Sequence, residues 1–266
     1  MVRTADRVRE ASAPRSLSGA NVSGEAGTEV AAALNTRSSA TGPVMVVGMH
    51  RSGTSFLTGS LQLAGLELGK HSAWNPYNLK GNRENDDFVA FHEKVLAARA
   101  AAWDQPPERV VRWTPEERQQ AQTLVAGYSG AGRWGFKDPR ALLMAEAWQE
   151  LLPDLAFVGI FRHPTAVARS LARRNAMQQE QAFALWSDYN RRLLALHDRS
   201  LFPLLCFDEG EEVLRQKLDR VLGEIGLKPL GAEQFYSSEL RRFRRTAAVL
   251  PKDMALLYGA LRARAC

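Results

Sequence analysis

Short runs of almost continuous apolar residues alternate along this chain with longer stretches in which apolar residues recur every three or four positions. A short apolar run is typical of a strand buried on both faces of a parallel sheet, and the longer period is typical of an amphipathic helix. One strand is expected on this basis to begin at Val44. Three others are expected over Arg133–Lys137, Leu155–Phe161 and Leu204–Phe207.

Helices are expected between and after these strands, and two of them have clear starts. Thr114-Pro115-Glu116-Glu117 combines an N-cap, a proline in the first turn and a glutamate placed for a capping box, and Asp138-Pro139 is a second cap-and-proline start. One helix is expected to follow the first strand and end near Gly65, and the next buries Phe88, Phe91, Val95 and Leu96. The other expected helices run from Thr114 to about Tyr128, from Asp138 to Leu151 or Leu152, from Pro164 towards Arg174, over Gln178–Arg199, over Glu211–Ile225 and over about Lys252–Arg262. The Asn-, Gly- and Pro-rich segment His71–Asn85 is expected to be a loop.

Strands that alternate with helices predict an α/β fold, a three-layer α/β/α arrangement with a mainly parallel central sheet. We expect one domain over residues 42–266, since no internal repeat divides it. Residues 1–41 are rich in Ala, Ser, Gly, Thr and Arg without an apolar period, which predicts a disordered N-terminal extension.

Composition narrows the class of partner. The 266 residues carry a formal net charge of +6, which favours anionic ligands. Arginine pairs raise the possibility of nucleic acid, but basic and aromatic residues do not interleave, so no nucleic-acid partner is expected. The two cysteines form neither a metal pattern nor a disulfide framework. With no secretory h-region and no apolar run of about 20 residues, we expect a cytoplasmic protein without a transmembrane segment.

The segment from Val44 to Leu57 predicts a buried strand, a tight glycine-containing loop and the first turn of a helix. A phosphate fits such a loop, because the helix N-terminus presents unpaired N–H groups and a favourable dipole. The spacing of Gly48, Gly53 and Ser55 matches the P-loop pattern G-x-x-x-x-G-K-[ST]. Thr54 replaces the lysine, and the positive charge comes earlier, at Arg51. This displacement indicates an anionic donor other than a magnesium-bound triphosphate.

A second segment places Arg162 where the strand Leu155–Phe161 ends, at the usual ligand edge of an open α/β sheet. Ser170 follows two turns into the next helix. An arginine fork and a hydroxyl suit a second phosphate. Taken alone, the segment is more simply explained as a strand–loop–helix unit with an exposed arginine and an incidental serine.

Together the two segments resemble the sulfotransferase family, in which R/K-S-G-T-[ST] and a later R-x-x-x-x-x-x-x-S hold 3′-phosphoadenosine 5′-phosphosulfate (PAPS). The resemblance spans roughly Val44 to Cys206 and implies a P-loop NTPase-like fold and no metal. It implies that Arg162 and Ser170 bind the 3′ phosphate, and that Arg51 also stabilises charge on the oxygen that leaves with the nucleotide. The residues implied to hold the 5′ phosphosulfate are Arg51, Ser52, Gly53, Thr54 and Ser55.

The resemblance also suggests the remaining catalytic groups. Residues 75–86 resemble a loop of the bacterial branch, N-P-x-G-x-x-E with extra residues, and Glu84 falls on its glutamate as the expected general base. A carboxylate that only stabilises a helix start is the alternative for Glu84, and His50 or Asp86 are alternative bases. Lys137-Asp138-Pro139-Arg140 resembles a second bacterial motif, in which Lys137 contacts the sulfonate or the acceptor, Arg140 binds donor or acceptor and Asp138 caps a helix.

Two further groups are open to more than one interpretation. Trp186, Tyr189 and Asn190 share a helix face that either lines an acceptor pocket or, more simply for Trp186, belongs to the core. The basic run Arg241–Arg245 either reaches the 3′ phosphate or forms a solvated face, and the solvated face is favoured.

The resulting prediction is a sulfotransferase that moves the sulfuryl group of PAPS to a hydroxyl of a carbohydrate, a lipid or a small metabolite and releases adenosine 3′,5′-bisphosphate. A lipid acceptor would imply peripheral membrane contact. A P-loop small-molecule or nucleotide kinase is an alternative, although it requires a Walker lysine and an acidic magnesium ligand at a strand end. The second alternative is a non-catalytic nucleotide-binding module. No sequence pattern identifies the acceptor or the oligomeric state.

Overall fold

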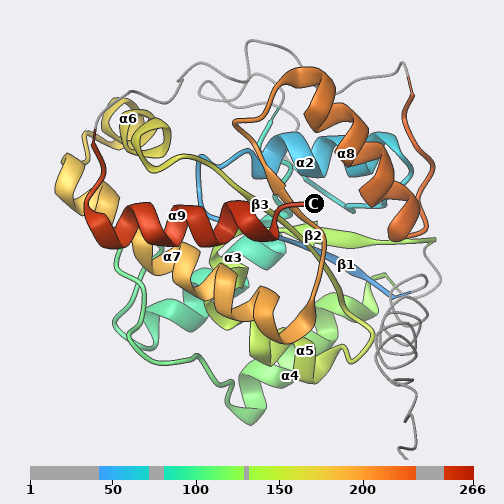
Figure 1. Cartoon of the computed structure of the whole chain (residues 1–266). Helices are drawn as coiled ribbons and strands as arrows, with labels where there is room; N and C mark the ends of the chain where they lie inside the picture. Colours follow the sequence, from blue (N-terminus) through green and yellow to red (C-terminus); the bar gives the residue numbers. More distant parts are fainter. Residues whose placement is uncertain (1–41, 72–80, 129–131, 232–248) are drawn as a thin grey trace, which may run out of the picture. The chain divides into compact units, whose positions relative to one another are not determined.

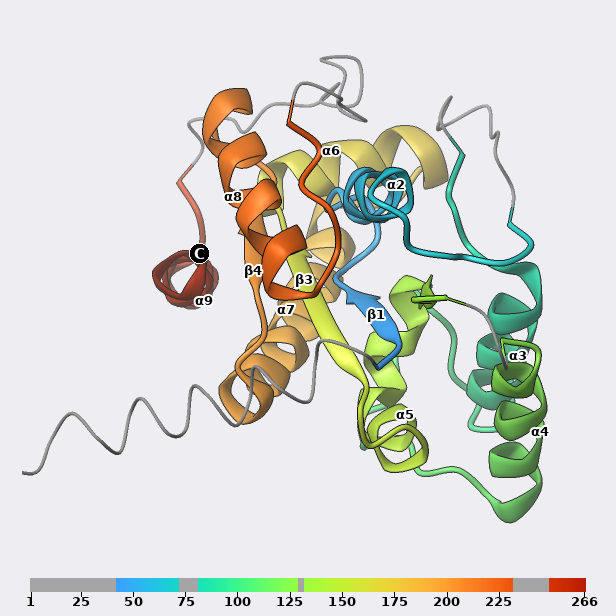
Figure 2. The ribbon, with the colours of Figure 1, turned by 90° about the vertical axis from the view of Figure 1, so that its right-hand side faces the viewer.

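The computed structural model describes residues 42–71, 81–128, 132–231 and 249–266. A parallel sheet lies at the centre of this part of the chain (Figure 1). The strand pairings give the order β2-β1-β3-β4. Figure 2 shows β4, β3 and β1 side by side. The strands are β1 (Val44–Val47), β2 (Gly135–Lys137), β3 (Ala156–Phe161) and β4 (Leu204–Cys206). Every strand residue is buried, which explains why the strands are continuous apolar runs.

Helices cover both faces of the sheet, so the expected three-layer α/β/α arrangement is confirmed (Figure 1). Alternate residues of β1 point to opposite faces. Val44 and Val46 pack with α2 and α8, whereas Met45 and Val47 belong to the larger core that includes α3, α7 and α9. The helices are α2 (Thr54–Leu63), α3 (Asp86–Ala97), α4 (Pro115–Ala126), α5 (Ala145–Leu151), α6 (Pro164–Asn175), α7 (Gln179–Ser200), α8 (Glu211–Glu224) and α9 (Lys252–Arg264).

Most expected elements are confirmed within one to three residues, and the capping box at α4 is present. The Glu117 N–H donates to Thr114 Oγ1 at 3.2 Å, and the Thr114 N–H donates to Glu117 Oε2 at 2.9 Å. These two bonds satisfy N–H groups that the helix itself leaves unpaired, so the local sequence alone was sufficient to predict this start.

One expected helix is wrong in detail. The helix predicted from Asp138 to Leu151 or Leu152 is divided into a 3₁₀ helix, η1 (Pro139–Met144), and the α-helix α5. The Ala141 N–H donates to the Asp138 carbonyl, a bond across three residues rather than four. Asp138 also accepts the Arg140 N–H through its side chain, at 3.1 Å, and this contact tightens the first turn.

Some expectations concern residues outside the described ranges. These are the N-terminal extension 1–41, residues 72–80 of the expected loop and the basic run Arg241–Arg245. Within the described ranges, no helix has both the length and the apolar character that crossing a bilayer requires.

Candidate active site

The loop after β1 turns sharply into α2 and prepares the N-terminus of that helix for an anion. Arg51 and Gly53 both have positive φ angles, of 66° and 97°. A side chain at Gly53 would meet the ring of Phe207 at 2.6 Å, so only glycine fits. Gly53 is also the N-cap of α2, and it offers no side-chain oxygen to the first N–H groups. The first turn contains no acidic residue either, so an anionic ligand would complement it.

The two sequence segments that suit phosphates meet in the structure. Arg51 Nε donates to Ser170 Oγ at 2.8 Å, although the two residues are 119 positions apart. Arg162 lies close to the same loop, since its Nη1 is 3.4 Å from the Arg51 carbonyl oxygen. The side chains of Arg162 and Ser170 are nearly fully buried. The exposed arginine of the simpler interpretation is therefore wrong, because Arg162 is buried.

Arg162 is held by several neighbours at the carboxyl ends of β3 and β4. Its guanidinium lies 5.1 Å from the centre of the Phe207 ring, and its Nε lies 3.6 Å from Asp208 Oδ1. The indole N–H of Trp186 donates to the Arg162 carbonyl at 2.9 Å. Trp186 is fully buried, as the core interpretation predicted. Asp208 was not predicted from the sequence, although its position just after an apolar strand was an available signal.

A second group of contacts joins Glu84, Lys137 and Ser55. Lys137, the last residue of β2, donates through Nζ to Glu84 Oε1 at 2.7 Å and lies 3.5 Å from Ser55 Oγ. Ser55 in turn donates to the Asn82 carbonyl at 3.2 Å. The Lys137 side chain is 1% exposed and that of Glu84 is 18% exposed, so the carboxylate keeps contact with solvent.

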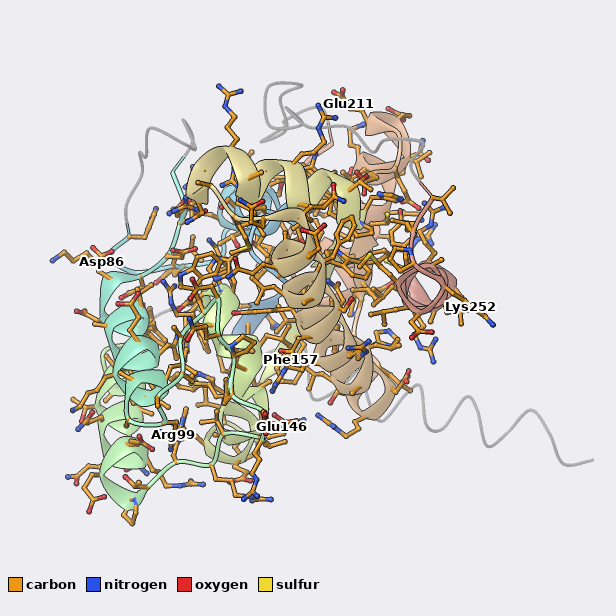
Figure 3. All side chains as sticks on the ribbon, turned by 90° about the vertical axis from the view of Figure 1, so that its left-hand side faces the viewer. Asp86, Arg99, Glu146, Phe157, Glu211 and Lys252 are labelled. Atoms are coloured by element: carbon orange, nitrogen blue, oxygen red, sulfur yellow. The ribbon has the colours of Figure 1, made fainter. Side chains whose placement is uncertain are left out.

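The alternative explanations for Glu84 have less geometric support. The N-cap of α3 is Asn85, whose side chain accepts the Asp87 N–H at 3.0 Å. Glu84 therefore precedes the cap and pairs with Lys137 instead of the helix terminus. Asp86 is exposed at the start of α3 (Figure 3).

His50 adjoins the loop but faces aromatic rings. Its ring centre lies 4.7 Å from that of Trp103 and 6.1 Å from that of Tyr189. Burial, followed by the charge of Arg140, holds the pKa of His50 well below its usual range. The imidazole is neutral at physiological pH for this reason. Its packing favours a structural role over that of general base.

Asp138 caps η1, as expected, and also belongs to a buried network that the sequence did not predict. Trp148 Nε1 donates to His92 Nε2 at 2.9 Å, which assigns the ring proton of neutral His92 to Nδ1, 2.8 Å from Asp138 Oδ2. Burial alone would raise the pKa of Asp138, but the hydrogen bond from His92 and the nearby Arg140 charge lower it. Arg140 is held between Asp138, at 2.9 Å, and Glu93, at 2.8 Å.

Among the loop residues, Ser52 has an unusual hydroxyl. Its side chain is fully buried, and its Oγ has no hydrogen-bond partner in the part of the chain that the structure describes. A buried hydroxyl without a partner is costly, so a bound anion at this loop would recover that cost. In the same ranges, no three His, Cys, Asp or Glu side chains are grouped to hold a metal ion.

Comparison with known proteins identifies a family. A family model described as the sulfotransferase family matches residues 43–209. The chain is similar to the sulfotransferase domain of the olefin synthase of Synechococcus PCC 7002, with 17% identity, 83% of this chain and 94% of that chain covered, and a TM-score of 0.49. It is also similar to sulfotransferase STF1 of Mycobacterium tuberculosis, with 16% identity, 87% and 78% covered, and a TM-score of 0.44. No curated protein sequence matches the chain significantly. The span of the family match contains every residue of the contacts described above.

Proposed function

This chain belongs to the sulfotransferase family, and we propose that its sulfuryl donor is PAPS and its acceptor a hydroxyl group. The observation that carries the choice of donor is the 2.8 Å hydrogen bond from Arg51 Nε to Ser170 Oγ. It joins the loop that suits a 5′ phosphosulfate to the helix that suits a 3′ phosphate. A donor with anionic groups at both positions would contact both segments at once.

The donor-binding residues follow from this assignment. The loop residues Arg51, Ser52, Gly53, Thr54 and Ser55 would hold the 5′ phosphosulfate, with the α2 N-terminus supplying N–H donors. Arg162 and Ser170 would hold the 3′ phosphate through charge-assisted hydrogen bonds. Ser170 already accepts from Arg51, so the phosphate would share or replace an existing contact.

The proposed chemistry is an in-line transfer. The acceptor oxygen forms a bond to sulfur while the bond from sulfur to the bridging oxygen breaks, and adenosine 3′,5′-bisphosphate leaves. Glu84 takes the proton of the acceptor hydroxyl. Lys137 engages Oε1 of Glu84, and Oε2 has no hydrogen-bond partner among the described residues, so Oε2 is the oxygen suited to that proton. Arg51 and Lys137 stabilise the negative charge that develops on the donor.

Lys137 connects the two halves of this chemistry. Its ammonium group contacts the proposed base, Glu84, and lies beside Ser55 of the proposed donor loop. The charge is therefore shared between the group that receives the proton and the loop that would hold the sulfonate.

We assign the acceptor to a carbohydrate, a lipid or a small metabolite. The cytoplasm is the proposed compartment, which is consistent with the free thiols of Cys206 and Cys266.

Isothermal titration calorimetry tests the donor. We expect the protein to bind adenosine 3′,5′-bisphosphate without added metal and more tightly than ATP with magnesium. Tighter binding of ATP with magnesium, and no binding of the bisphosphate, would favour a P-loop kinase and overturn the proposal. Transfer of radiolabelled sulfate from PAPS into fractionated metabolites, glycans and lipids would then identify the acceptor class.

Substitutions at the second segment test the position of the 3′ phosphate. Arg162→Ala and Ser170→Ala should weaken the bisphosphate by about tenfold or more while changing the affinity for adenosine 5′-phosphate much less, because only the bisphosphate has a 3′ phosphate. Arg173→Ala is the matched control, since it removes an exposed arginine from the same helix, α6. Equal losses for both nucleotides would contradict the assignment of Arg162 and Ser170.

A further inference from the structure

Asp208 lies at the same sheet edge as Arg162 because of the register between β3 and β4. Phe161 pairs with Cys206, and the Phe207 N–H donates to the Phe161 carbonyl at 2.9 Å. The residues that follow each strand, Arg162 and Asp208, are consequently brought side by side. Neither residue belongs to a strand, so their side chains meet just beyond the sheet.

The two carboxylate oxygens of Asp208 contact different groups. Oδ2 accepts the His163 N–H at 2.5 Å, and Oδ1 lies 3.6 Å from Arg162 Nε. The Asp208 side chain is 8% exposed and the Arg162 side chain 4%, so the pair is shielded from water. The backbone contact fixes the carboxylate itself, and the fixed carboxylate can then orient the guanidinium.

The other neighbours of Arg162 restrict the remaining motions of its guanidinium. The Phe207 ring lies 5.1 Å away on one side, and Nη1 faces the Arg51 carbonyl oxygen at 3.4 Å. Nε lies 3.6 Å from Asp208 Oδ1, an ion-pair distance longer than a hydrogen bond, so together these neighbours restrict the orientation of the planar group relative to the β1 loop. Phosphate recognition by arginine depends on such orientation, because the fork must match two oxygens at once.

From these contacts we infer that Asp208 is a positioning residue, which aims Arg162 at the 3′ phosphate of the donor without touching the donor itself. This inference rests on the proposed function, in which Arg162 binds that phosphate. It adds a residue from the end of β4 to a donor site otherwise built by the ends of β1 and β3.

The sign of one measurement separates positioning from a plain effect of charge. If Asp208 acted only as a nearby negative charge, its removal would tighten the binding of every anionic nucleotide. If Asp208 aims Arg162, its removal weakens the nucleotide that has a 3′ phosphate, even though the site has become more positive. The two roles therefore predict opposite directions for adenosine 3′,5′-bisphosphate.

The experiment compares the affinities for adenosine 3′,5′-bisphosphate and adenosine 5′-phosphate by calorimetry in wild type, Asp208→Ala and Asp208→Asn. For Asp208→Ala we expect the preference for the bisphosphate to fall about tenfold, with little change for the 5′-phosphate. Asp208→Asn keeps an oxygen for the His163 N–H and should restore part of the preference. Glu209→Gln is the matched control, because this neighbouring carboxylate pairs with Lys217 at 2.8 Å.

The possible results lead to distinct conclusions. A preference that stays at the wild-type value in both Asp208 variants, or that rises, would overturn the positioning role and leave the donor assignment intact. A wild-type protein that does not prefer the bisphosphate would overturn the donor assignment, and the role of Asp208 with it. Thermal unfolding of each variant checks that the fold is retained, and if Asp208→Ala does not fold, Asp208→Asn decides by the same criterion with a smaller expected loss.

Discussion

Lys137 and Asp138 are adjacent in sequence, yet their side chains belong to two different regions of the molecule. Successive residues at a strand end point to opposite sides. Lys137 reaches Glu84 and Ser55 beside the β1 loop, whereas Asp138 reaches His92 and Arg140 beneath η1. In the first region the last residue of β2, Lys137, pairs with the acidic side chain of Glu84, whereas in the second the acidic side chain is that of Asp138, the residue that follows β2.

The two regions differ in how fully their acidic side chains are enclosed, although Nε of Arg140, beside Asp138, is also buried without a hydrogen-bond partner among the described residues. Asp138, His92 and Trp148 are fully buried, and their hydrogen bonds close on one another. Beside the loop, Glu84 keeps some exposure, and the buried Ser52 hydroxyl lacks a partner among the described residues. A closed network can only contribute to stability and shape, whereas an incompletely paired group has capacity left for a ligand. Function is therefore expected at charges that are held in place but not fully enclosed.

The largest effect is expected from Glu84→Gln, which keeps the shape of the side chain and removes its basicity. Turnover should fall by about 10²–10⁴-fold, because general base catalysis contributes that much. Binding of adenosine 3′,5′-bisphosphate should stay near the wild-type value, whereas the free energy of unfolding should fall, because the substitution leaves the buried Lys137 ammonium without its counter-charge. Sulfate transfer from labelled PAPS measures turnover, calorimetry measures the affinity for the bisphosphate, and urea unfolding measures stability. Asp86→Asn serves as the control, and an equal loss there instead of at Glu84 would move the base to Asp86.

A smaller effect, on stability, is expected from Asp138→Asn. The substitution removes a charge that accepts hydrogen bonds from His92 and Arg140, at a cost of about 2–3 kcal/mol in the free energy of unfolding. Turnover per folded molecule should fall much less than in Glu84→Gln. Urea unfolding gives the free energy of unfolding, and Glu108→Gln, which changes an exposed carboxylate, is the control. An unchanged midpoint together with a large loss of turnover would erase the distinction between the two regions.

The smallest effect concerns the pH dependence of that stability. The folded pKa of Asp138 lies below its ordinary value of 3.8, so protonation favours the unfolded chain. Its contribution is fully present above the ordinary pKa and is lost as the pH falls below it, by at most about 1.4 kcal/mol per pH unit. The difference in unfolding free energy between wild type and Asp138→Asn should therefore shrink between about pH 5 and the most acidic pH at which the protein still folds. A difference that is constant over this range would mean that Asp138 does not titrate with folding.

The sequence was sufficient where the determining interactions are local or follow from sheet geometry. Apolar periodicity located the strands, and Thr114 with Glu117 defined the start of α4. The rule that ligands bind at the carboxyl ends of parallel strands indicated Arg162, and the structure places its Nη1 3.4 Å from the Arg51 carbonyl oxygen. The family resemblance brought Glu84 and Lys137 into one proposed site, and the structure joins them by an ion pair.

The sequence was insufficient where packing decides the outcome. Periodicity does not distinguish a 3₁₀ turn from an α turn over six mostly apolar residues, so η1 was missed. His92 and Trp148 lie 46 and 10 residues from Asp138 in the chain, and no local pattern links a buried imidazole to its partners. Asp208 was missed because β4 is short, although the rule that placed Arg162 applies equally to the residue after β4.

The strand order has a consequence for how the protein is made. β1 is synthesised before the other described strands, yet both of its neighbours, β2 and β3, begin only at Gly135 and Ala156. At roughly 5–20 residues per second, a ribosome needs about 5–20 s to produce the chain between them. During that interval the apolar Val44–Val47 segment has no sheet partner, and unpaired apolar strands of nascent chains are targets for aggregation and for chaperones. One of the two inner strands of the finished sheet therefore remains without a sheet partner for much of its synthesis.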